Sequence, residues 1–159
     1  MKIHKNILII SGNGMMGNTI YKFLNSKKLN VFYTVRSLSK LIFKKKFLII
    51  NNISKKDNLK KIKLFIKTNK ISLIINCCGV TKHEKRSYQK KYAFKVNASL
   101  NHNLSKIKNT KLLILSSDCV FDGKKGNYVE KNEDYGSDIY SLSKRKGEIT
   151  NKKNVITFR

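Results

Sequence analysis

Short apolar runs alternate with longer amphipathic stretches along the whole chain. The runs are rich in Ile, Leu and Val, are bounded by polar residues, and do not alternate between apolar and polar positions. This pattern is typical of strands that are buried on both faces of a sheet. Six strands are predicted on this basis, at Asn6–Ile10, Asn30–Val35, Phe47–Ile50, Leu73–Cys77, Lys111–Leu115 and Asn154–Phe158.

The stretches between these runs are long enough to form helices. Helices are predicted at Met15–Ser26, Asp57–Asn69, Tyr88–Lys108 and Ile139–Asn151. Strands that alternate with helices of this length indicate an α/β fold with a doubly wound parallel sheet of about six strands. The 159 residues suit one domain.

The net charge of +26 raises the question of a nucleic acid or an anionic membrane as partner. The basic residues are spread along the chain, however, with few aromatic residues between them and no recognisable nucleic-acid-binding motif. Abundant Lys, Asn and Ile with no Pro or Trp is the composition that an AT-rich coding sequence produces. These observations disfavour nucleic acid as the main partner.

Acidic residues are distributed unevenly. None occurs before Asp57, and seven of the nine lie between Asp118 and Glu148. The first third of the chain is therefore purely cationic, which suits an anionic ligand there.

The three cysteines have neither the number nor the spacing of a disulfide framework or a zinc site, so no metal is expected. They suit buried positions in a reducing cytosol. The apolar run at Ile7–Ile10 is too short for a signal peptide or a membrane span. We expect a soluble cytoplasmic protein without a membrane partner.

A glycine-rich turn, Ser11-Gly12-Asn13-Gly14-Met15-Met16-Gly17, joins the first predicted strand to the first helix. Glycines at this place let the backbone approach a pyrophosphate, whose charge lies against the helix N-terminus. The position favours a dinucleotide site, with an ordinary strand–helix turn as the alternative.

The end of the second strand bears on the choice of dinucleotide. An acid is expected there for the ribose 2′-hydroxyl of NAD, but the sequence reads Tyr-Thr-Val-Arg-Ser, with Arg36 at the end of the strand. A guanidinium can bind a 2′-phosphate with two hydrogen bonds, so NADPH is predicted over NADH. A solvated arginine is the alternative interpretation.

Two further positions bear on this site. Gly79 follows the fourth strand, where a residue without a side chain would let the cofactor lie close. Asn97, in the long helix that follows, could hold backbone groups or a water near the site, or serve only as a satisfied structural amide.

Three residues towards the end of the chain suggest carbonyl chemistry. Ser117 follows the fifth strand, and Tyr140 and Lys144 are four residues apart and share one helix face. Free tyrosine has a pKa near 10, and a nearby ammonium group favours the phenolate, which brings a phenol closer to proton exchange at neutral pH. The trio predicts protonation of a carbonyl oxygen while a nicotinamide supplies hydride.

The segment SSDCVFDGKKGNYVEKNEDYGSDIYSLSKRKGE resembles the signature of the dTDP-4-dehydrorhamnose reductase family, within the extended short-chain dehydrogenase/reductases. The glycine turn, INCCGVTKHE and KVNASLNHNLSKI also have counterparts there. The resemblance implies that residues 1–159 form an NAD(P)-binding Rossmann domain. It also implies reduction of the 4-keto group of a nucleotide-linked deoxysugar, with a place in dTDP-rhamnose and cell-surface polysaccharide biosynthesis.

The family implies roles for individual residues. Tyr140 would be the proton donor, Lys144 its partner and a ligand of the ribose, and Ser117 the hydroxyl that bonds the carbonyl oxygen. The residues expected to contact the cofactor are Ser11, Gly12, Asn13, Gly14, Met15, Met16, Gly17, Arg36, Asn52, Cys78, Gly79, Val80, Asn97, Ser116, Tyr140 and Lys144. Those expected to contact the substrate are Ser117, Asp118, Val120 and Phe121.

The chain departs from the family pattern at several points. Ser11 occupies the place of the first glycine of the turn, Ser117 that of a usual threonine, and Ser141 that of a glycine. Relatives continue well beyond the position that matches Arg159, so we expect the C-terminal substrate-binding region to be missing. A homodimer or a partner would then supply that region, and turnover as well as affinity would suffer without it.

Two other functions remain open. The chain could be a non-catalytic NADP-binding or regulatory module, as in one known subunit of this superfamily. It could also be a relative of the sugar-nucleotide epimerases or dehydratases, although the VFDG segment favours a reductase.

Overall fold

The computed structural model describes residues 6–38, 46–53 and 55–159. Its centre is a six-stranded parallel sheet in the order β3-β2-β1-β4-β5-β6. The strands are β1 (Asn6–Ile10), β2 (Val31–Val35), β3 (Phe47–Ile49), β4 (Ile71–Asn76), β5 (Lys111–Leu115) and β6 (Val155–Phe158). This is the strand order of a dinucleotide-binding Rossmann fold, and it confirms the predicted doubly wound sheet.

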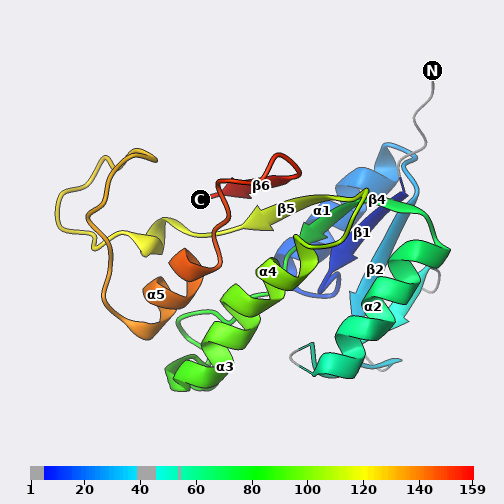
Figure 1. Cartoon of the computed structure of the whole chain (residues 1–159), viewed down its shortest axis with the longest axis horizontal. Helices are drawn as coiled ribbons and strands as arrows, with labels where there is room; N and C mark the ends of the chain where they lie inside the picture. The colour runs from blue at the N-terminus through cyan, green and yellow to red at the C-terminus, as the bar shows by residue number, and fades with distance from the viewer. Residues whose placement is uncertain (1–5, 39–45, 54) are drawn as a thin grey trace.

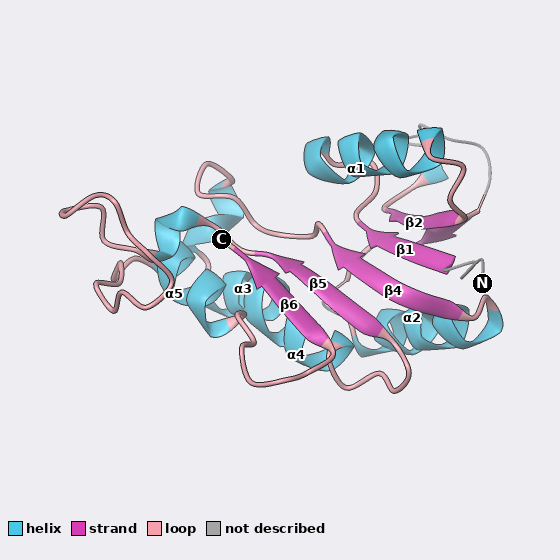
Figure 2. Cartoon of the chain, turned by 90° about the horizontal axis from the view of Figure 1, so that it is seen from above, coloured by secondary structure: helices cyan, strands magenta, loops and turns pink. Residues whose placement is uncertain are grey.

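Helices cover both faces of the sheet. Helix α1 (Met15–Ser26) lies on one side, and α2 (Lys56–Thr68) lies on the other together with α4 (Leu100–Leu104), as Figure 2 shows. Helix α5 (Ile139–Lys146) packs against α3 (Lys90–Phe94) at the end of the molecule that carries the carboxyl ends of the strands (Figure 1).

The predicted elements are present with shifted bounds. The expected long helix from Tyr88 ends at Leu104, and a π-helical segment at Lys95–Ser99 separates α3 from α4. A short 3-10 helix at Lys85–Tyr88 precedes it. The last helix ends at Lys146 because Gly147 follows as its C-cap, so Ile149 lies outside it and is buried in the core instead.

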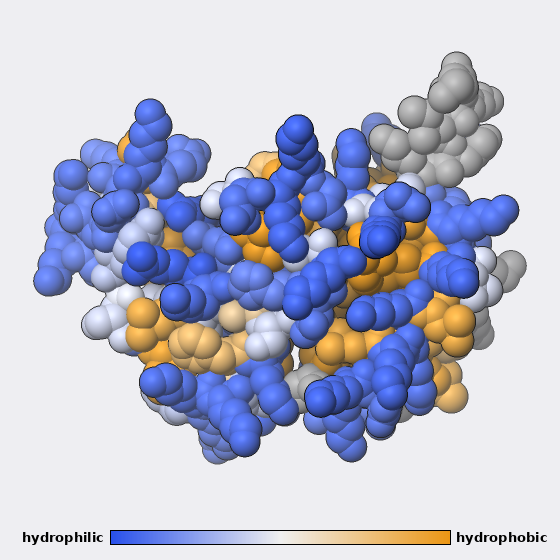
Figure 3. All heavy atoms as spheres, in the orientation of Figure 1, coloured by the Kyte–Doolittle hydropathy of each residue, from blue (hydrophilic) through white to orange (hydrophobic). Residues whose placement is uncertain are grey.

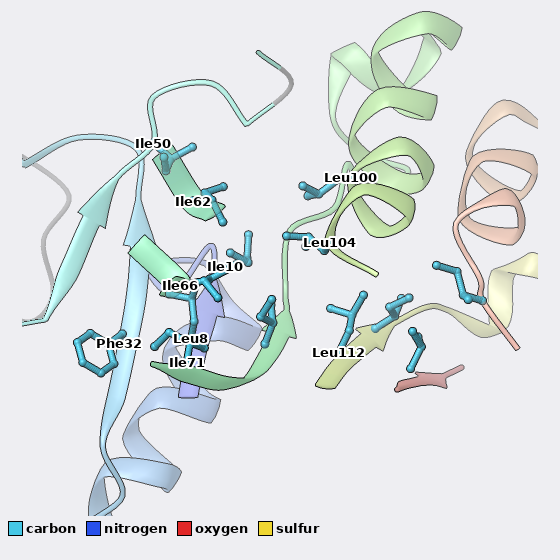
Figure 4. Packing of buried hydrophobic residues seen from close by; sticks show 14 residues of the cluster. Leu8, Ile10, Phe32, Ile50, Ile62, Ile66, Ile71, Leu100, Leu104 and Leu112 are labelled. Atoms are coloured by element: carbon cyan, nitrogen blue, oxygen red, sulfur yellow. The ribbon is translucent and has the colours of Figure 1, made fainter. Parts of the chain in front are cut away.

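The core consists of two clusters, one on each side of the sheet. The larger one joins the sheet to α2 and α4 through residues such as Leu8, Ile62 and Leu104 (Figure 4). The smaller one lies under α1, where the Tyr21 and Tyr33 rings meet edge to face with centroids 5.2 Å apart. Burial of apolar side chains on both faces explains why the strand sequences show no alternation.

The outer strand is covered less completely. Val155 packs into the larger cluster, whereas Ile156 and Phe158, which point to the opposite face, are 57% and 54% exposed. The side of the sheet that carries α1 therefore presents apolar surface at β6.

On the face drawn in Figure 3, hydrophilic residues are scattered between apolar ones and do not form one continuous patch. No helix within the described residues is both long enough and apolar enough to cross a membrane.

Candidate cofactor and active site

The candidate site lies at the point in the sheet where the strand order reverses. Strand β1 is flanked by β2 on one side and by β4 on the other, and ligands of such sheets bind at the carboxyl ends of the strands at this point. A cavity of about 160 Å³ opens there. It is lined by Ser11, Asn13, Thr34, Val35, Arg36, Ile50, Asn51, Asn52, Ile53, Cys78, Gly79, Val80, Glu84, Arg86, Tyr92 and Val96.

The glycine turn after β1 is shaped by very close backbone contacts. A Cβ on Gly12 would lie 2.5 Å from the Cβ of Tyr33, and one on Gly17 would lie 2.3 Å from the carbonyl oxygen of Ser11. Neither position therefore has room for a side chain. The turn is tied to β2 by Thr34, whose Oγ1 accepts a hydrogen bond from the Ser11 amide (2.8 Å) and whose carbonyl accepts one from the Gly12 amide (2.9 Å).

Ser11 adopts the left-handed backbone conformation, with a φ of 64°. This conformation costs an L-residue about 1–2 kcal/mol and is adopted freely by glycine. The structure thus explains why a glycine is usual here in the family that the chain resembles. The serine departs from that pattern while adopting the same left-handed region that glycine favours.

The start of α1 is suited to an anion. Its N-cap is Gly14, which has no side chain to accept a hydrogen bond from the first-turn amides, and the first turn contains no acid. Free amide groups and the helix dipole together favour a phosphate at such a position. Met15 and Met16 in this turn are exposed, and Asn13 lines the cavity. These residues fit the pyrophosphate of a dinucleotide.

Strands β2, β3 and β4 contribute the rest of the cavity wall. Arg36 is exposed directly after β2, and Asn52 follows β3. Cys78 and Gly79 follow β4; burial raises the pKa of the Cys78 thiol to about 11, although the charges of Arg36 and Lys144 oppose this. Burial raises the pKa of the neighbouring Cys77 to about 12. The raised pKa values favour the protonated thiols, which are weaker nucleophiles than thiolates.

Asn97 joins the loop after β4 to the helix that carries the predicted catalytic residues. Its Oδ1 accepts a hydrogen bond from the Val80 amide (2.8 Å), and its Nδ2 donates to the Ser143 hydroxyl (2.9 Å). Asn97 and Ser143 are both buried, and Asn97 lies in the π-helical segment. Such segments are frequent at functional sites. The sequence left open whether Asn97 holds backbone groups, and in the structure it does.

A second buried amide extends this connection. The Nδ2 of Asn101 donates to the carbonyl oxygens of Asn97 (3.1 Å) and Gly147 (3.0 Å), and its Oδ1 accepts from the Nδ2 of Asn76 (2.5 Å). Gly147 lies so close that a Cβ would be 1.9 Å from the Asn97 carbonyl oxygen. The end of β4, the π-helical segment and the end of α5 are thereby fixed to one another.

Helix α5 places Tyr140 and Lys144 beside this network. Asp138 caps the helix by accepting hydrogen bonds from the Ser141 amide (3.1 Å) and hydroxyl (2.7 Å), and Tyr140 is half-buried in the first turn. The Nζ of Lys144 donates to the Leu115 carbonyl at the end of β5 (2.8 Å).

The Lys144 ammonium group also adjoins the loop after β4. A Cβ on Gly79 would lie 3.7 Å from its Nζ. Burial lowers the pKa of Lys144, and the negative charge of Glu148 acts in the opposite direction. Lys144 is thus a partly desolvated cation at the edge of the sheet where the cofactor cavity opens.

The two serines after β5 have different partners. The Ser116 hydroxyl donates to Glu148 (2.6 Å), whose carboxylate also pairs with the Arg159 guanidinium (2.8 Å). The Ser117 hydroxyl donates to Asp118 (3.2 Å) and accepts from the Cys119 amide (3.2 Å). Ser116 therefore helps to fix the segment that directly follows α5, whereas the Ser117 hydroxyl makes long contacts near the surface.

A larger cavity of about 660 Å³ adjoins the loop after Ser117. Asp118 and Phe121, two of the predicted substrate contacts, line it. The Phe121 ring stacks on Tyr128, with centroids 4.5 Å apart. Val120 differs from the expectation, because it is fully buried and its side chain has no access to a ligand.

Sequence reasoning missed several residues that shape the site. Thr34, Glu84, Arg86 and Tyr92 line the smaller cavity, and Asn101 completes the buried network. No motif marks them. A buried amide inside a predicted helix looks like any other asparagine until its partners are known.

Residues 5–159 match the family described as "RmlD substrate binding domain". No curated protein matches the chain by sequence.

Three of the similar solved structures are dTDP-4-dehydrorhamnose reductases by name. The enzyme of Clostridium acetobutylicum is 27% identical with a TM-score of 0.70, covering 89% of this chain and 47% of that one. A hypothetical reductase of Sulfolobus tokodaii is 26% identical with a TM-score of 0.74, covering 89% and 50%. The enzyme of Bacillus anthracis, solved in complex with NADP, is 23% identical with a TM-score of 0.69, covering 90% and 47%.

The chain thus spans about half the length of these solved structures. The family match extends over nearly every residue of the chain, and the fold agrees with that of the reductases. The chain therefore belongs to the RmlD substrate binding domain family, within the extended short-chain dehydrogenase/reductase superfamily.

Proposed function

We propose that the chain binds NADP(H) and supplies the proton-transfer groups for reducing the 4-keto group of a nucleotide-linked deoxysugar. One observation carries the proposal. The Lys144 ammonium lies beside Gly79 and the end of β5, on the same helix as Tyr140, at the sheet edge where the glycine turn opens. The reductases among the solved relatives support the choice of reaction.

The residues of the cavity suit a nicotinamide dinucleotide, which when bound supplies hydride. The uncapped first turn of α1 would hold the pyrophosphate, and Gly79 leaves room for the cofactor beside Lys144. Arg36 would bind a 2′-phosphate, since no acid lines the cavity at the end of β2. These features favour NADPH over NADH.

Tyr140 would donate the proton. Its hydroxyl would transfer a proton to the carbonyl oxygen of the substrate as that oxygen gains negative charge. Ser117 would donate a hydrogen bond to the same oxygen, for which its hydroxyl must rotate away from Asp118.

Lys144 has a supporting role. An ammonium group has three donors, and Leu115 accepts from one of them, which leaves two for the Tyr140 hydroxyl and the ribose of the cofactor. Its positive charge would stabilise the phenolate that remains after proton transfer.

The substrate region is the second part of the proposal. The solved relatives are about twice as long as this chain. Binding energy from remote parts of a substrate contributes to turnover as well as to affinity. We propose that a further polypeptide segment completes the sugar-nucleotide site next to the larger cavity at Asp118 and Phe121.

The test is to incubate the chain with NADPH and a dTDP-4-keto-6-deoxysugar and to follow the loss of NADPH absorbance. Substituting Tyr140→Phe should lower the rate about 10²–10⁴-fold, because it removes the proton donor. The matched control is Tyr88→Phe, since Tyr88 is 77% exposed. Its rate should not change.

The other outcomes separate the alternatives. NADPH binding without turnover would favour the non-catalytic binding module or a reductase that needs the further segment for turnover. Conversion of the sugar without net consumption of NADPH would favour an epimerase. Failure to bind either nicotinamide dinucleotide would overturn the proposal.

A further inference from the structure

The smaller cavity is lined by a second guanidinium group, that of Arg86, which belongs neither to the glycine turn nor to β2. Among the described residues that line it, three are charged, namely Arg36, Glu84 and Arg86. Arg36 follows β2, whereas Arg86 lies in the 3-10 helix after β4. The two arginines therefore reach the cavity from two different elements of the fold.

Arg86 is held in place by two neighbours. Its guanidinium lies over the Tyr92 ring, 4.6 Å from the centroid, and it forms an ion pair with the Glu84 carboxylate. Tyr92 and Glu84 line the same cavity. A guanidinium that is fixed before a ligand arrives loses less conformational entropy when it binds.

Donors remain available for a ligand. A guanidinium has five N–H donors, and one carboxylate occupies only part of that set. The Arg86 side chain is 47% exposed, so a ligand can reach it.

The charges of the cavity wall also favour an anion. Two guanidinium groups and one carboxylate leave a net charge of +1 on the described lining residues. A phosphate monoester carries about −1.5 to −2 charges at pH 7, and guanidinium groups bind phosphate with two parallel hydrogen bonds. The positive charges of Arg36 and Arg86 would therefore favour a phosphate in this cavity.

We infer that Arg86 is a second specificity-determining residue for the 2′-phosphate of the cofactor, in addition to Arg36, with Tyr92 and Glu84 positioning its guanidinium. The inference rests on the proposed function, because it assigns the adenosine end of the cofactor to this cavity. It goes further in making the preference for NADPH depend on arginines from two separate elements of the fold.

Adenosine 2′-phosphate and adenosine 5′-phosphate are the appropriate probes, because they differ only in the position of the phosphate and need no catalysis. Calorimetry should show that the chain prefers the 2′-phosphate. Substituting Arg86→Ala should weaken binding of the 2′-phosphate about 10- to 100-fold, as expected for loss of charged hydrogen bonds, and leave the 5′-phosphate nearly unchanged.

Two matched controls test the structural argument. Lys85→Ala removes one positive charge from the same 3-10 helix, but Lys85 does not line the cavity, so binding of the 2′-phosphate should be retained. Tyr92→Phe keeps the ring under the guanidinium and should resemble the unmodified chain. Tyr92→Leu removes the ring and should weaken binding of the 2′-phosphate.

The inference is overturned if Arg86→Ala binds the 2′-phosphate as well as the unmodified chain does, or if Lys85→Ala loses as much affinity. It is also overturned if the chain does not distinguish the two nucleotides. None of these results contradicts the proposed reaction. That reaction is tested separately by the rate of NADPH consumption and its loss in Tyr140→Phe.

Discussion

Where β1 meets β2, the site is shaped by residues that lack side chains, whereas between β4 and α5 it is shaped by buried side chains that form hydrogen bonds. Gly12 and Gly17 let the turn press against Tyr33 and Ser11. On the other side, Asn97 and Asn101 connect three elements that are distant in the sequence. Both arrangements bring backbone segments to the same edge of the sheet.

The two arrangements differ in what they position. The glycine turn leaves amide groups uncovered, so it offers the backbone itself to a ligand. The amide network instead fixes α5, and through it the side chains of Tyr140 and Lys144. A dinucleotide can be bound by a shaped backbone, whereas proton transfer needs side chains held at fixed distances.

The largest effect on stability is expected for Asn101→Leu. This change removes the amide that bonds Asn97 and Gly147 and leaves the Asn76 side chain without its buried partner. Unsatisfied buried polar groups cost about 1–3 kcal/mol each, so the free energy of unfolding should fall by about 3–4 kcal/mol. Urea unfolding followed by circular dichroism measures this.

The matched control is Asn103→Ala, two residues further along. Its side chain bonds only the Ser99 carbonyl near the surface, so the loss should stay below about 1 kcal/mol. Equal losses for the two variants would mean that the buried network does not hold α5.

Alanine substitutions at Gly147 and Gly17 should have the next largest effect on stability. They compare the two sides of the site directly. A Cβ at Gly147 or at Gly17 meets a backbone oxygen at 1.9 or 2.3 Å, and overpacking of this kind costs about 1–3 kcal/mol. Gly14→Ala is the control, because its nearest contact would be 3.4 Å away. Chemical denaturation of the three alanine variants should rank Gly14→Ala as the least affected.

Ser11→Gly should stabilise the chain slightly. Glycine relieves the left-handed conformation of Ser11 but adds freedom to the unfolded chain, so a net gain of about 0.5–1 kcal/mol is expected. Thermal unfolding would show a rise in the melting temperature. A lower melting temperature would instead show that the serine side chain makes a contribution of its own.

The smallest expected effect is a pH dependence of the free energy of unfolding. Burial lowers the pKa of Lys144 below its usual 10.5, so between the two pKa values the unfolded chain binds more protons at this position than the folded chain. Stability then rises with pH in that window. The free energy of unfolding of the unmodified chain, measured relative to Lys144→Met, should increase as the pH rises towards 10.5. A difference that does not change with pH would contradict the buried environment of Lys144.

The fold was largely predictable because it depends on local patterns. The apolar runs located the six strands to within two residues at each end, and the glycine turn indicated where the first helix begins. The helix after β4 was predicted as one piece, since nothing in the residues around Asn97 signals a π-helical segment. That departure depends on tertiary hydrogen bonds to Val80 and Ser143.

The candidate site was predictable only where a motif lies within one segment. Ser11–Gly17 and the Tyr140–Lys144 pair are such segments, and the family resemblance is strongest there. Arg86 and Asn101 reach the site through folding alone, so no spacing reveals them. Val120 shows the converse, because a position inside a recognisable motif turned inward to the core.

The exposed side chains of Ile156 and Phe158 have a consequence for the behaviour of the protein in solution. With a net charge of +26, copies of the chain repel one another at low ionic strength. Salt shortens the range of that repulsion from about 30 Å at 0.01 M to about 3 Å at 1 M, while the attraction between apolar surfaces remains. Buffers of low ionic strength should therefore keep the protein dispersed, and high-salt steps in a purification should promote its aggregation.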